Sequence, residues 1–254
     1  MSESEVFTAV EDGILIVTIN RPEAKNAMNQ AAAQGIAAAM DRLEAEADLR
    51  VAILTGAGGT FCSGMDLKGF LRGERPIVEG RGFGGLASWT PKKPVIAAVD
   101  GYALAGGMEM ALSCDLIVAN AGAKFGIPEA KRGLCAGAGG LIKLPRQIPS
   151  RVAMELALTG DFIDAQRAYE LGFINRIVDG PAVDGAKELA RRIADNGPLA
   201  VAASKAVLRD SFSWTDEEMW DKQQGYIDGV FKSNDAREGA TAFAQKRKPE
   251  WTGT

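Results

Sequence analysis

The sequence predicts an α/β fold with a helical C-terminal part. In the first half of the chain, β-branched apolar runs alternate with segments of helical spacing, as in folds where helices cover a sheet. Glycine-rich loops follow several of these apolar runs. From residue 150 onward nearly every segment has helical spacing. These three observations together predict a β-rich α/β core that is followed by helices.

The first strands and the first helix carry regular patterns. Residues 13–20 (GILIVTIN) are β-branched and bounded by turn residues, which predicts a buried strand. Asn29 is expected to cap a helix that runs to about Ala47, because apolar residues recur there every three or four positions. Residues 51–55 (VAILT) predict a second buried strand, which leads into a glycine-rich loop at 56–64.

The rest of the chain alternates shorter elements. Residues 68–90 are rich in glycine and arginine and have weak periodicity, which favours a mobile segment with short helices that could act as a lid. A helix is expected from Gly106 to about Cys114. Strands are expected at 95–99, 116–119, 124–127 and 174–178, and later helices at about 150–159, 164–171, 184–196, 199–210, 216–231 and 235–247.

Composition and charge exclude several classes of protein. Hydrophobic residues make up 46% of the chain and charged residues 24%, as in ordinary globular proteins. The net charge of −4 gives no general attraction to nucleic acid or to an anionic membrane. Residues 1–5 are acidic and lack the pattern of a signal peptide, and no apolar run approaches the ~18 residues of a membrane span. We expect a cytoplasmic protein whose partners include neither nucleic acid nor a membrane.

The chain contains no histidine. This excludes catalytic triads that use imidazole, Cys-His nucleophiles and HExxH zinc helices. The three cysteines, Cys62, Cys114 and Cys135, are widely spaced and form no CxxC pair, so neither a disulfide framework nor a zinc site is expected.

The glycine clusters do not match a phosphate-binding loop. Neither GxGxxG nor GxxxxGK[ST] occurs in full, and the nearest approach, at 82–87, does not follow a convincing strand. Turn chemistry is an equally good explanation of the glycines at 137–140. Gly106 and Gly107 differ, because two glycines at a helix start indicate that something approaches the backbone closely.

Two carboxylates occur in mainly apolar surroundings. Glu109 lies one turn into the expected helix, and Glu129 follows Pro128 after an apolar strand. A helix dipole stabilises a first-turn glutamate by about 0.3–1 kcal/mol, which would explain each residue without any catalytic role. Alternatively, burial raises the pKa of a carboxyl group toward the range needed to exchange protons near neutrality. The spacing alone leaves both explanations open.

Five ordered motifs carry a resemblance to a known family. They are residues 20–29 (NRPEAKNAMN), 61–68 (FCSGMDLK), 93–101 (KPVIAAVDG), 105–109 (AGGME) and 125–129 (FGIPE). Residues 243–249 (FAQKRKP) also look like the family's final helix. On these motifs the whole chain resembles the crotonase superfamily, the enoyl-CoA hydratase/isomerase family.

The resemblance implies a particular fold and assembly. We expect a spiral of ββα turns over residues 1–195 and a helical region at 196–254 that mediates trimerisation. The assembly would be a homotrimer, or a hexamer built as a dimer of trimers.

The resemblance also implies an enzyme that acts on acyl-CoA thioesters. The backbone N–H groups of Met65 and Gly106 would form an oxyanion hole around the thioester carbonyl. Family members that hydrate the double bond carry glutamates at the positions of Glu109 and Glu129. The expected reaction is reversible hydration of a trans-2-enoyl-CoA to a 3-hydroxyacyl-CoA, with no metal or redox cofactor.

Further residues are expected to bind the substrate by the same resemblance. Lys25 would lie near the nucleotide end of CoA and Lys68 at the rim of the loop, while Lys246 would reach a neighbouring subunit. Asp66 is expected to orient the loop. The complete predicted set of binding residues is Lys25, Ala27, Ser63, Asp66, Leu67, Lys68, Gly107 and Lys246.

Two departures from the common hydratase pattern bear on the substrate. Cys135-Ala136 stands where many hydratases have Ile-Pro, and residues 81–86 resemble carnitinyl-CoA dehydratases. Cys135 could line the acyl pocket, but the expected role is that of a small packed hydrophobic residue, since no basic side chain can be placed nearby to activate its thiol. The alternatives to hydration are therefore dehydration of a carnitinyl-type thioester, isomerisation of an enoyl-CoA, and binding of acyl-CoA without catalysis.

Overall fold

The computed structural model describes residues 4–254. The prediction that the N-terminus lacks a signal peptide falls partly on residues 1–3, which lie outside the described range.

A six-stranded sheet has the order β1-β2-β3-β6-β8-β11 and is parallel except for the antiparallel pair β1–β2. Its strands are β1 (Val6–Glu11), β2 (Ile14–Ile19), β3 (Val51–Gly56), β6 (Val95–Val99), β8 (Leu116–Asn120) and β11 (Arg176–Val178).

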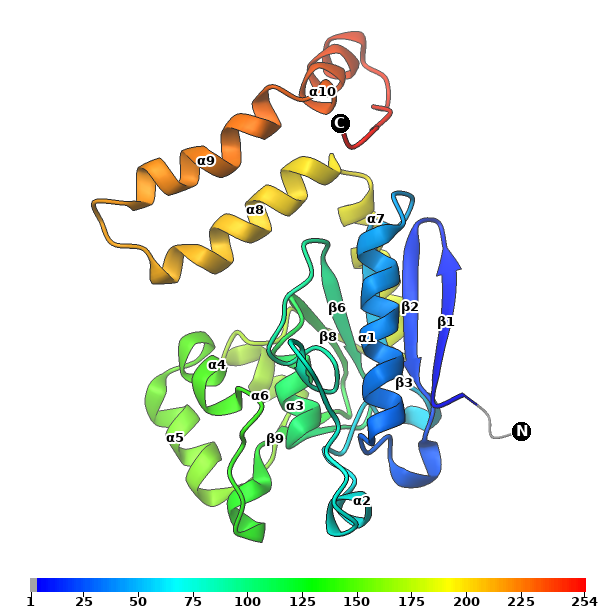
Figure 1. The fold of residues 1–254 in the computed structure, drawn as a ribbon, viewed down its shortest axis with the longest axis vertical. Coiled ribbons are helices and arrows are strands. Elements are labelled where there is room, and N and C mark those ends of the chain that lie inside the picture. The colour runs from blue at the N-terminus through cyan, green and yellow to red at the C-terminus, as the bar shows by residue number, and fades with distance from the viewer. Residues whose placement is uncertain (1–3) are drawn as a thin grey trace.

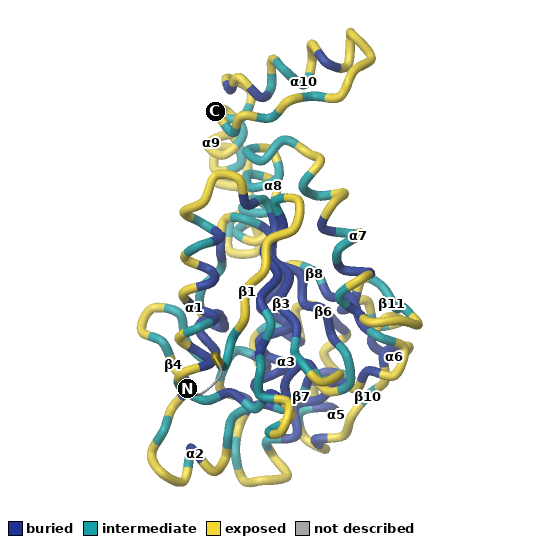
Figure 2. Tube along the Cα trace, turned by 90° about the vertical axis from the view of Figure 1, so that its right-hand side faces the viewer, coloured by how far each residue is buried: buried dark blue, intermediate teal, exposed yellow. Residues whose placement is uncertain are grey.

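Helices cover both faces of this sheet (Figure 1). Alternate strand residues point to opposite faces, so Leu15 and Val17 join the core beneath α1 (Gln30–Ala45), while Ile14 and Ile16 pack with α7 (Ala182–Ala194). The α7 face is made of small side chains, which lets the helix approach the sheet closely: Ala182, Ala186 and Ala190. Figure 2 shows the inner strands of the sheet as the buried centre of the molecule, whereas the edge strand β1 is mostly exposed.

A second sheet gives the chain its spiral turns. It has the order β10-β9-β7, in which β7 (Tyr102–Leu104) runs parallel to β9 (Lys124–Gly126) and β10 (Ile163–Asp164) is antiparallel to β9. The chain passes from β6 through β7 into helix α3 (Gly106–Ala111), and then from β8 through β9 into the 3₁₀ helix η3 (Pro128–Arg132). Each ββα turn therefore delivers a helix start to the same end of the molecule.

Residues 67–89 are more ordered in the structure than their pattern indicated. They form α2 (Leu67–Leu71) and an antiparallel hairpin of β4 (Ile77–Val78) and β5 (Gly82–Phe83). The hairpin packs on α1, and a Cβ on Gly85 would lie 2.4 Å from the Ala33 carbonyl oxygen.

The C-terminal helices extend away from the sheet (Figures 1 and 2). The remaining helices are α4 (Gly140–Gln147), α5 (Ser150–Thr159), α6 (Ala165–Glu170), α8 (Pro198–Asp210), α9 (Met219–Phe231) and α10 (Asn234–Gln245). No residue of α8 or α9 is buried. Several large apolar side chains are exposed there and just beyond: Leu208, Phe212, Trp220, Phe231 and Phe243. Helices α8–α10 together form the arm.

Most predicted elements are confirmed, and the misses have physical reasons. Strands β4, β5 and β10 were missed because each has only two residues. The Asn29 cap is present, since its side chain accepts a hydrogen bond from Ala32 N at 2.9 Å. Strand β1 was missed because five of its six residues are exposed, and β7 because it has only three residues. Helix α4 was missed because it begins with Gly140 and contains Pro145, both poor helix residues.

The buried side-chain amide of Asn26 connects the loops that precede residues 61–68. The Asn26 side chain is fully buried; its Oδ1 accepts from Arg21 N at 2.8 Å, and its Nδ2 donates to the carbonyl oxygens of Ala57 and Thr60. Next to it, Met28 N donates to Gly64 O and Asp66 N donates to Met28 O. The amide therefore fixes the chain that carries residues 63–66.

We predict that Asn26→Ala destabilises the fold by about 3 kcal/mol, because it leaves buried backbone groups without partners. The midpoint of thermal unfolding should fall accordingly. Asn120→Ala is the matched control, since that amide also makes three bonds, to Asp179 O, Gly180 O and Gly122 N, but at an exposed position where water replaces them. Equal losses in the two variants would contradict the role assigned to Asn26.

Candidate active site

A cavity of about 820 Å³ opens where the starts of α3 and η3 meet the β4–β5 hairpin. This volume is within the range of small-molecule and cofactor sites. Seven of the twelve predicted site residues line it: Lys25, Ser63, Met65, Leu67, Gly106, Glu109 and Glu129. The other five, Ala27, Asp66, Lys68, Gly107 and Lys246, do not.

Two backbone N–H groups come together at one wall of the cavity. Cys62 pairs in parallel with Ala103, and its N–H and C=O bond to Tyr102 O at 2.9 Å and Leu104 N at 3.0 Å. This pairing carries the chain from Cys62 to Met65 alongside the entry to α3, so that a Cβ on Gly64 would lie 3.4 Å from Gly106 N. Neither Met65 N–H nor Gly106 N–H donates to another residue within 4–254. Two free donors at a helix start form a site for negative charge.

The two glycines at the start of α3 are required for packing. A Cβ on Gly106 would lie 2.4 Å from the ring of Phe83, and one on Gly107 would lie 2.1 Å from the Cys62 carbonyl oxygen. The sequence indicated a close approach to this backbone. The structure shows that the approaching groups include the protein's own Phe83 ring and Cys62 backbone.

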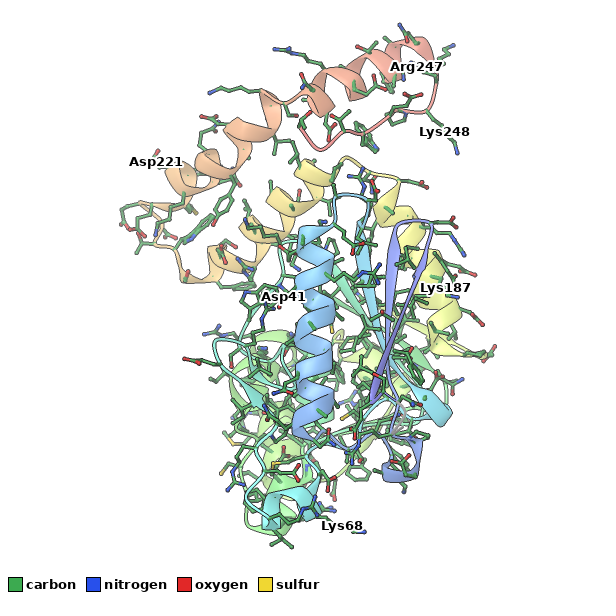
Figure 3. All side chains as sticks on the ribbon, turned by 45° about the vertical axis from the view of Figure 1, so that its right-hand side comes forward. Asp41, Lys68, Lys187, Asp221, Arg247 and Lys248 are labelled. Carbon is green, nitrogen blue, oxygen red and sulfur yellow. The ribbon has the colours of Figure 1, made fainter. Side chains whose placement is uncertain are left out.

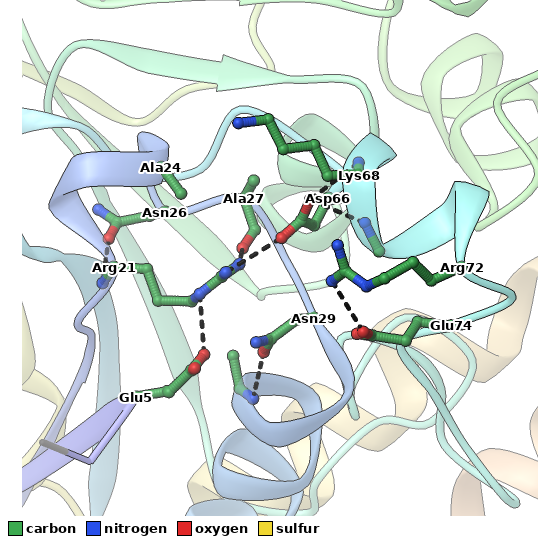
Figure 4. Close-up of polar contacts among 12 residues, drawn as sticks. Glu5, Arg21, Ala24, Asn26, Ala27, Asn29, Asp66, Lys68, Arg72 and Glu74 are labelled. Atoms are coloured by element: carbon green, nitrogen blue, oxygen red, sulfur yellow. Dashed lines mark hydrogen bonds and ion pairs between the residues drawn. The ribbon is translucent and has the colours of Figure 1, made fainter. Parts of the chain in front are cut away.

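Asp66 holds the loop at residues 63–66 in place through hydrogen bonds and an ion pair (Figure 4). Its Oδ1 caps α2 by accepting from Lys68 N at 3.0 Å and Gly69 N at 3.1 Å, while Oδ2 pairs with Arg21 Nη2 at 3.0 Å. Burial alone would raise the pKa of Asp66, but the bonds from Gly69 N and Arg21 outweigh it and hold the pKa below its usual value. Arg21 also donates to the Ala27 carbonyl oxygen, so these three residues form one brace.

Glu109 is buried and its carboxylate is held by backbone donors. Its side chain is 2% exposed, and Oε1 accepts from Ala138 N at 2.7 Å and Gly140 N at 2.8 Å, at the start of α4. Burial raises the pKa of Glu109, and the two N–H bonds and the nearby Lys143 ammonium oppose that rise. These donors favour the ionised form, which leaves Oε2 for a ligand in the cavity.

Glu129 faces the same cavity without such support. Its Oε2 is buried and has no hydrogen-bond partner within residues 4–254. Burial raises the pKa of Glu129 to about 7, and the charge of Glu109 adds to that rise. Burial thus raises the pKa of both carboxyls, but the two differ in support, since backbone donors and Lys143 stabilise ionised Glu109, whereas nothing described binds the buried oxygen of Glu129.

The predicted cations occupy different places. Lys25 lines the cavity, with Nζ 5.4 Å from the centre of the Tyr102 ring. Lys68 is exposed on α2 and lies at the opposite end of the molecule from Arg247 and Lys248 in Figure 3. Lys246, which ends α10, therefore lies at the far end from the cavity of its own chain. Arg247 is paired with Glu238.

The structure adds cavity residues that the sequence analysis did not single out. Phe83, Tyr102, Arg132 and Phe162 line the cavity. Phe83 and Tyr102 lie on short strands that were missed, although an aromatic residue beside glycine in 82–83 was an available signal. The prediction of a packed Cys135 was wrong, since this residue is exposed and lines the cavity.

The described residues hold neither a clustered metal site nor a membrane-spanning helix. Within 4–254, no group of three or more His, Cys, Asp or Glu side chains gathers as a metal site would require. No helix in the same range has the length and apolar character needed to cross a membrane.

The two glycines of α3 give a test of this packing. We predict that Gly107→Ala destabilises the protein more than Gly106→Ala, because its Cβ meets a backbone carbonyl, whereas Phe83 is a side chain that can move. Overpacking of this kind costs about 1–3 kcal/mol. Adding Phe83→Leu should recover the stability of Gly106→Ala but not of Gly107→Ala, as measured by denaturant unfolding. Recovery of both variants would refute the assignment.

The unpaired carboxyl of Glu129 predicts a pH-dependent gain in stability for Glu129→Gln. The folded pKa of about 7 lies above the usual value of 4.5, so ionisation of the folded protein is unfavourable once the pH exceeds 4.5. Because the carboxyl is partly solvated, we expect the variant to gain about 1–2 kcal/mol at pH 8 and little at pH 4.5. Unfolding at both pH values measures this, with exposed Glu155→Gln as the control that should gain nothing.

The sequence is similar to those of known proteins. The family model described as Enoyl-CoA hydratase/isomerase matches residues 9–254. Carnitinyl-CoA dehydratase of Proteus mirabilis is 40% identical over 263 residues, covering 100% of both chains. Enoyl-CoA hydratase EchA19 of Mycobacterium tuberculosis is 43% identical over 249 residues, covering 93% of this chain and 92% of its own.

Solved structures agree with the sequence comparison. An enoyl-CoA hydratase from Mycobacterium tuberculosis H37Rv has a TM-score of 0.97 and 57% identity, covering 99% of this chain and 100% of its own. A carnitinyl-CoA hydratase from Mycobacterium avium has a TM-score of 0.79 and 39% identity, with 100% of each chain covered. The chain therefore has the crotonase fold and belongs to the enoyl-CoA hydratase/isomerase family.

Proposed function

We propose that this protein is an enoyl-CoA hydratase that adds water reversibly, with syn stereochemistry, to a trans-2-enoyl-CoA and forms a 3-hydroxyacyl-CoA. One observation supports the proposal most strongly. A single cavity contains Glu109 and Glu129, whose carboxyls lie in different environments, and the free N–H groups of Met65 and Gly106 lie beside them. Hydration needs this combination, because a base must activate water, an acid must supply a proton, and an anionic intermediate must be stabilised.

The N–H groups act on the thioester. They donate to its carbonyl oxygen and draw electron density from the conjugated double bond, which makes the β carbon electrophilic. As the carbonyl becomes an enolate its oxygen gains charge, and both donors bind it more strongly than before. Loss of one donor of this kind typically costs about 3–4 kcal/mol of transition-state stabilisation.

The two glutamates add the elements of water. Glu109 takes a proton from the water whose oxygen bonds to the β carbon, and Glu129 gives its proton to the α carbon. Glu109 ends protonated and Glu129 ends ionised, so one proton must move back before the next turnover. The assignment follows the environments, since Glu109 is the carboxylate bound by N–H donors and Glu129 is the carboxyl whose pKa is near 7. The reaction as proposed uses no metal or redox cofactor.

We further propose how the CoA moiety is bound. Lys25 and Lys68 would attract its phosphates from the cavity wall and from α2, and Ser63 and Leu67 would contact the substrate inside the cavity. Ala27 and Gly107 do not line the cavity, so they would act by shaping the wall behind it. Asp66 would act indirectly, by bracing the loop. Lys246 lies too far from its own cavity for this role, so it would serve the site of a neighbouring subunit.

We propose that the arm mediates assembly into a homotrimer, or into a hexamer formed by two trimers. Support comes from large apolar residues exposed on and beside its helices, including Trp220 at 69%, Phe231 at 76% and Phe243 at 87%. Exposed apolar residues gathered in this way mark protein interfaces. The division at residue 195 would then separate the catalytic spiral from the part that assembles. We place the protein in the cytoplasm.

A carnitinyl-CoA dehydratase is the second candidate. Full-length relatives that are 40% identical carry that name, and the reaction would use the same two carboxyls in reverse. The acyl group separates the two candidates, so a panel of enoyl-CoA and 3-hydroxyacyl-CoA esters, including a carnitinyl thioester, decides between them.

We predict that Glu109→Gln and Glu129→Gln each lower kcat for hydration by about 10²–10⁴-fold, because each removes one proton-transfer group. The loss of the conjugated enoyl-thioester absorbance measures the rate. Exposed Glu155→Gln is the control and should keep wild-type activity.

Each other outcome identifies an alternative. Activity equal to wild type in both glutamine variants contradicts the catalytic assignment. An isomerase would move a double bond from the 3- to the 2-position even as Glu109→Gln, because that reaction needs only one carboxyl. A protein that binds acyl-CoA but turns over none of the panel would be a carrier.

A further inference from the structure

Lys143 is a partly buried cation without an acidic partner in direct contact. It lies on α4, and its Nζ donates to Ser113 Oγ at 2.5 Å and to the Ala87 carbonyl oxygen at 2.7 Å. No carboxylate of residues 4–254 lies within 4.0 Å of its Nζ. A desolvated ammonium that contacts only neutral oxygens is unfavourable, so its presence beside an active site requires an explanation.

The contacts of Lys143 connect three parts of the cavity wall. Ser113 Oγ donates in turn to the Glu109 carbonyl oxygen at 2.6 Å, so the ammonium is tied to the helix that carries Glu109. Lys143 also lies one turn after Gly140, whose N–H holds the Glu109 carboxylate. Ala87 follows the hairpin that sets Phe83 against Gly106. One ammonium group therefore joins α3, α4 and the hairpin segment.

We propose that Lys143 is a positioning residue for hydration, which keeps the start of α4 against Glu109 and supplies the positive charge that favours the ionised carboxylate. This inference rests on the proposed function, in which Glu109 is the base. Lys143 itself touches no substrate in this role.

The charges around Glu109 are consistent with the proposal. Burial disfavours the ionisation of Glu109, whereas the N–H groups of Gly140 and Ala138 and the charge of Lys143 favour it. Glu109 in turn raises the pKa of Glu129 on η3. Arg132 acts on Glu129, and Cys114 lies near Lys143. Burial lowers the pKa of Lys143, and the charge of Glu109 opposes this. Lys143 is thus the cation that acts on the proposed base.

The test separates charge from packing with three substitutions. Lys143→Gln retains a donor for Ser113 and Ala87 but has no charge, and Lys143→Met is a second neutral variant for use if the amide does not fit. Lys143→Arg retains the charge. Lys205→Met is the matched control, because Lys205 Nζ likewise bonds a backbone oxygen, Lys93 O at 2.9 Å, but pairs with Asp115 at 2.6 Å.

The first readout is kcat/KM for hydration against pH. Without the charge, Glu109 holds its proton to higher pH, so the acid limb should move upward and the ratio of kcat/KM at pH 8 to that at pH 6 should grow about 3–10-fold. Lys143→Arg should keep the wild-type acid limb. Lys205→Met should lower the unfolding midpoint and leave the acid limb in place.

Three results would overturn the proposal. They are a neutral variant with the wild-type acid limb, an equal shift in Lys205→Met, and an equal shift in Lys143→Arg. A second readout does not depend on activity: titration of the Glu109 carboxyl by ¹³C NMR, with Glu109→Gln assigning the resonance, should show ionisation at higher pH in the neutral variants. If wild type hydrates no enoyl-CoA, the proposed function fails, and this titration still decides the influence of Lys143.

Discussion

The site depends on the parallel pairing of Cys62 with Ala103. Two chain segments that are far apart in sequence run side by side there, and each ends at a backbone N–H that no other described residue accepts. Gly107 makes the pairing possible, because a side chain at that position would collide with the Cys62 carbonyl oxygen. Backbone donors held in this way need no reorganisation when charge develops on a ligand, which is the basis of electrostatic catalysis.

The difference between the two carboxyls follows from what the backbone offers each one. Glu109 meets the open end of α4, where N–H groups without helical partners bind one of its oxygens. Glu129 lies in a 3₁₀ helix beyond an apolar strand, and nothing in the described chain binds its buried oxygen. The same chemical group is therefore stabilised in its ionised form by backbone donors at one position and has a pKa of about 7 at the other. A chain without histidine can perform acid–base chemistry near pH 7 in this way.

The sequence correctly predicted those parts of the molecule that local patterns determine. The buried strands β2, β3 and β6, helix α1 and its Asn29 cap follow from hydrophobic spacing and capping chemistry. The order of the five motifs identified the family, which the comparisons then confirmed. Glu109 and Glu129 were singled out by their apolar surroundings, and they do share a cavity.

The features that the sequence did not predict are determined by tertiary contacts. The N–H groups that hold Glu109 come from a helix that begins with glycine and contains proline, so local propensity argues against it. Cys135 was expected to be a packed hydrophobic residue rather than part of the acyl pocket, yet it is exposed and lines the cavity. The ammonium of Lys143 joins segments around residues 87 and 113, a juxtaposition that no spacing in the chain encodes.

The contact between Phe83 and the backbone at Gly106 limits how this enzyme can be redesigned. The same ring lines the cavity and lies where a side chain at Gly106 would be, next to one of the two free N–H groups. Directed evolution that widens the cavity by trimming this aromatic residue would also loosen the wall behind that donor. Broader substrate range and fast turnover are therefore coupled at one position, and libraries that vary the hairpin alone would trade one for the other.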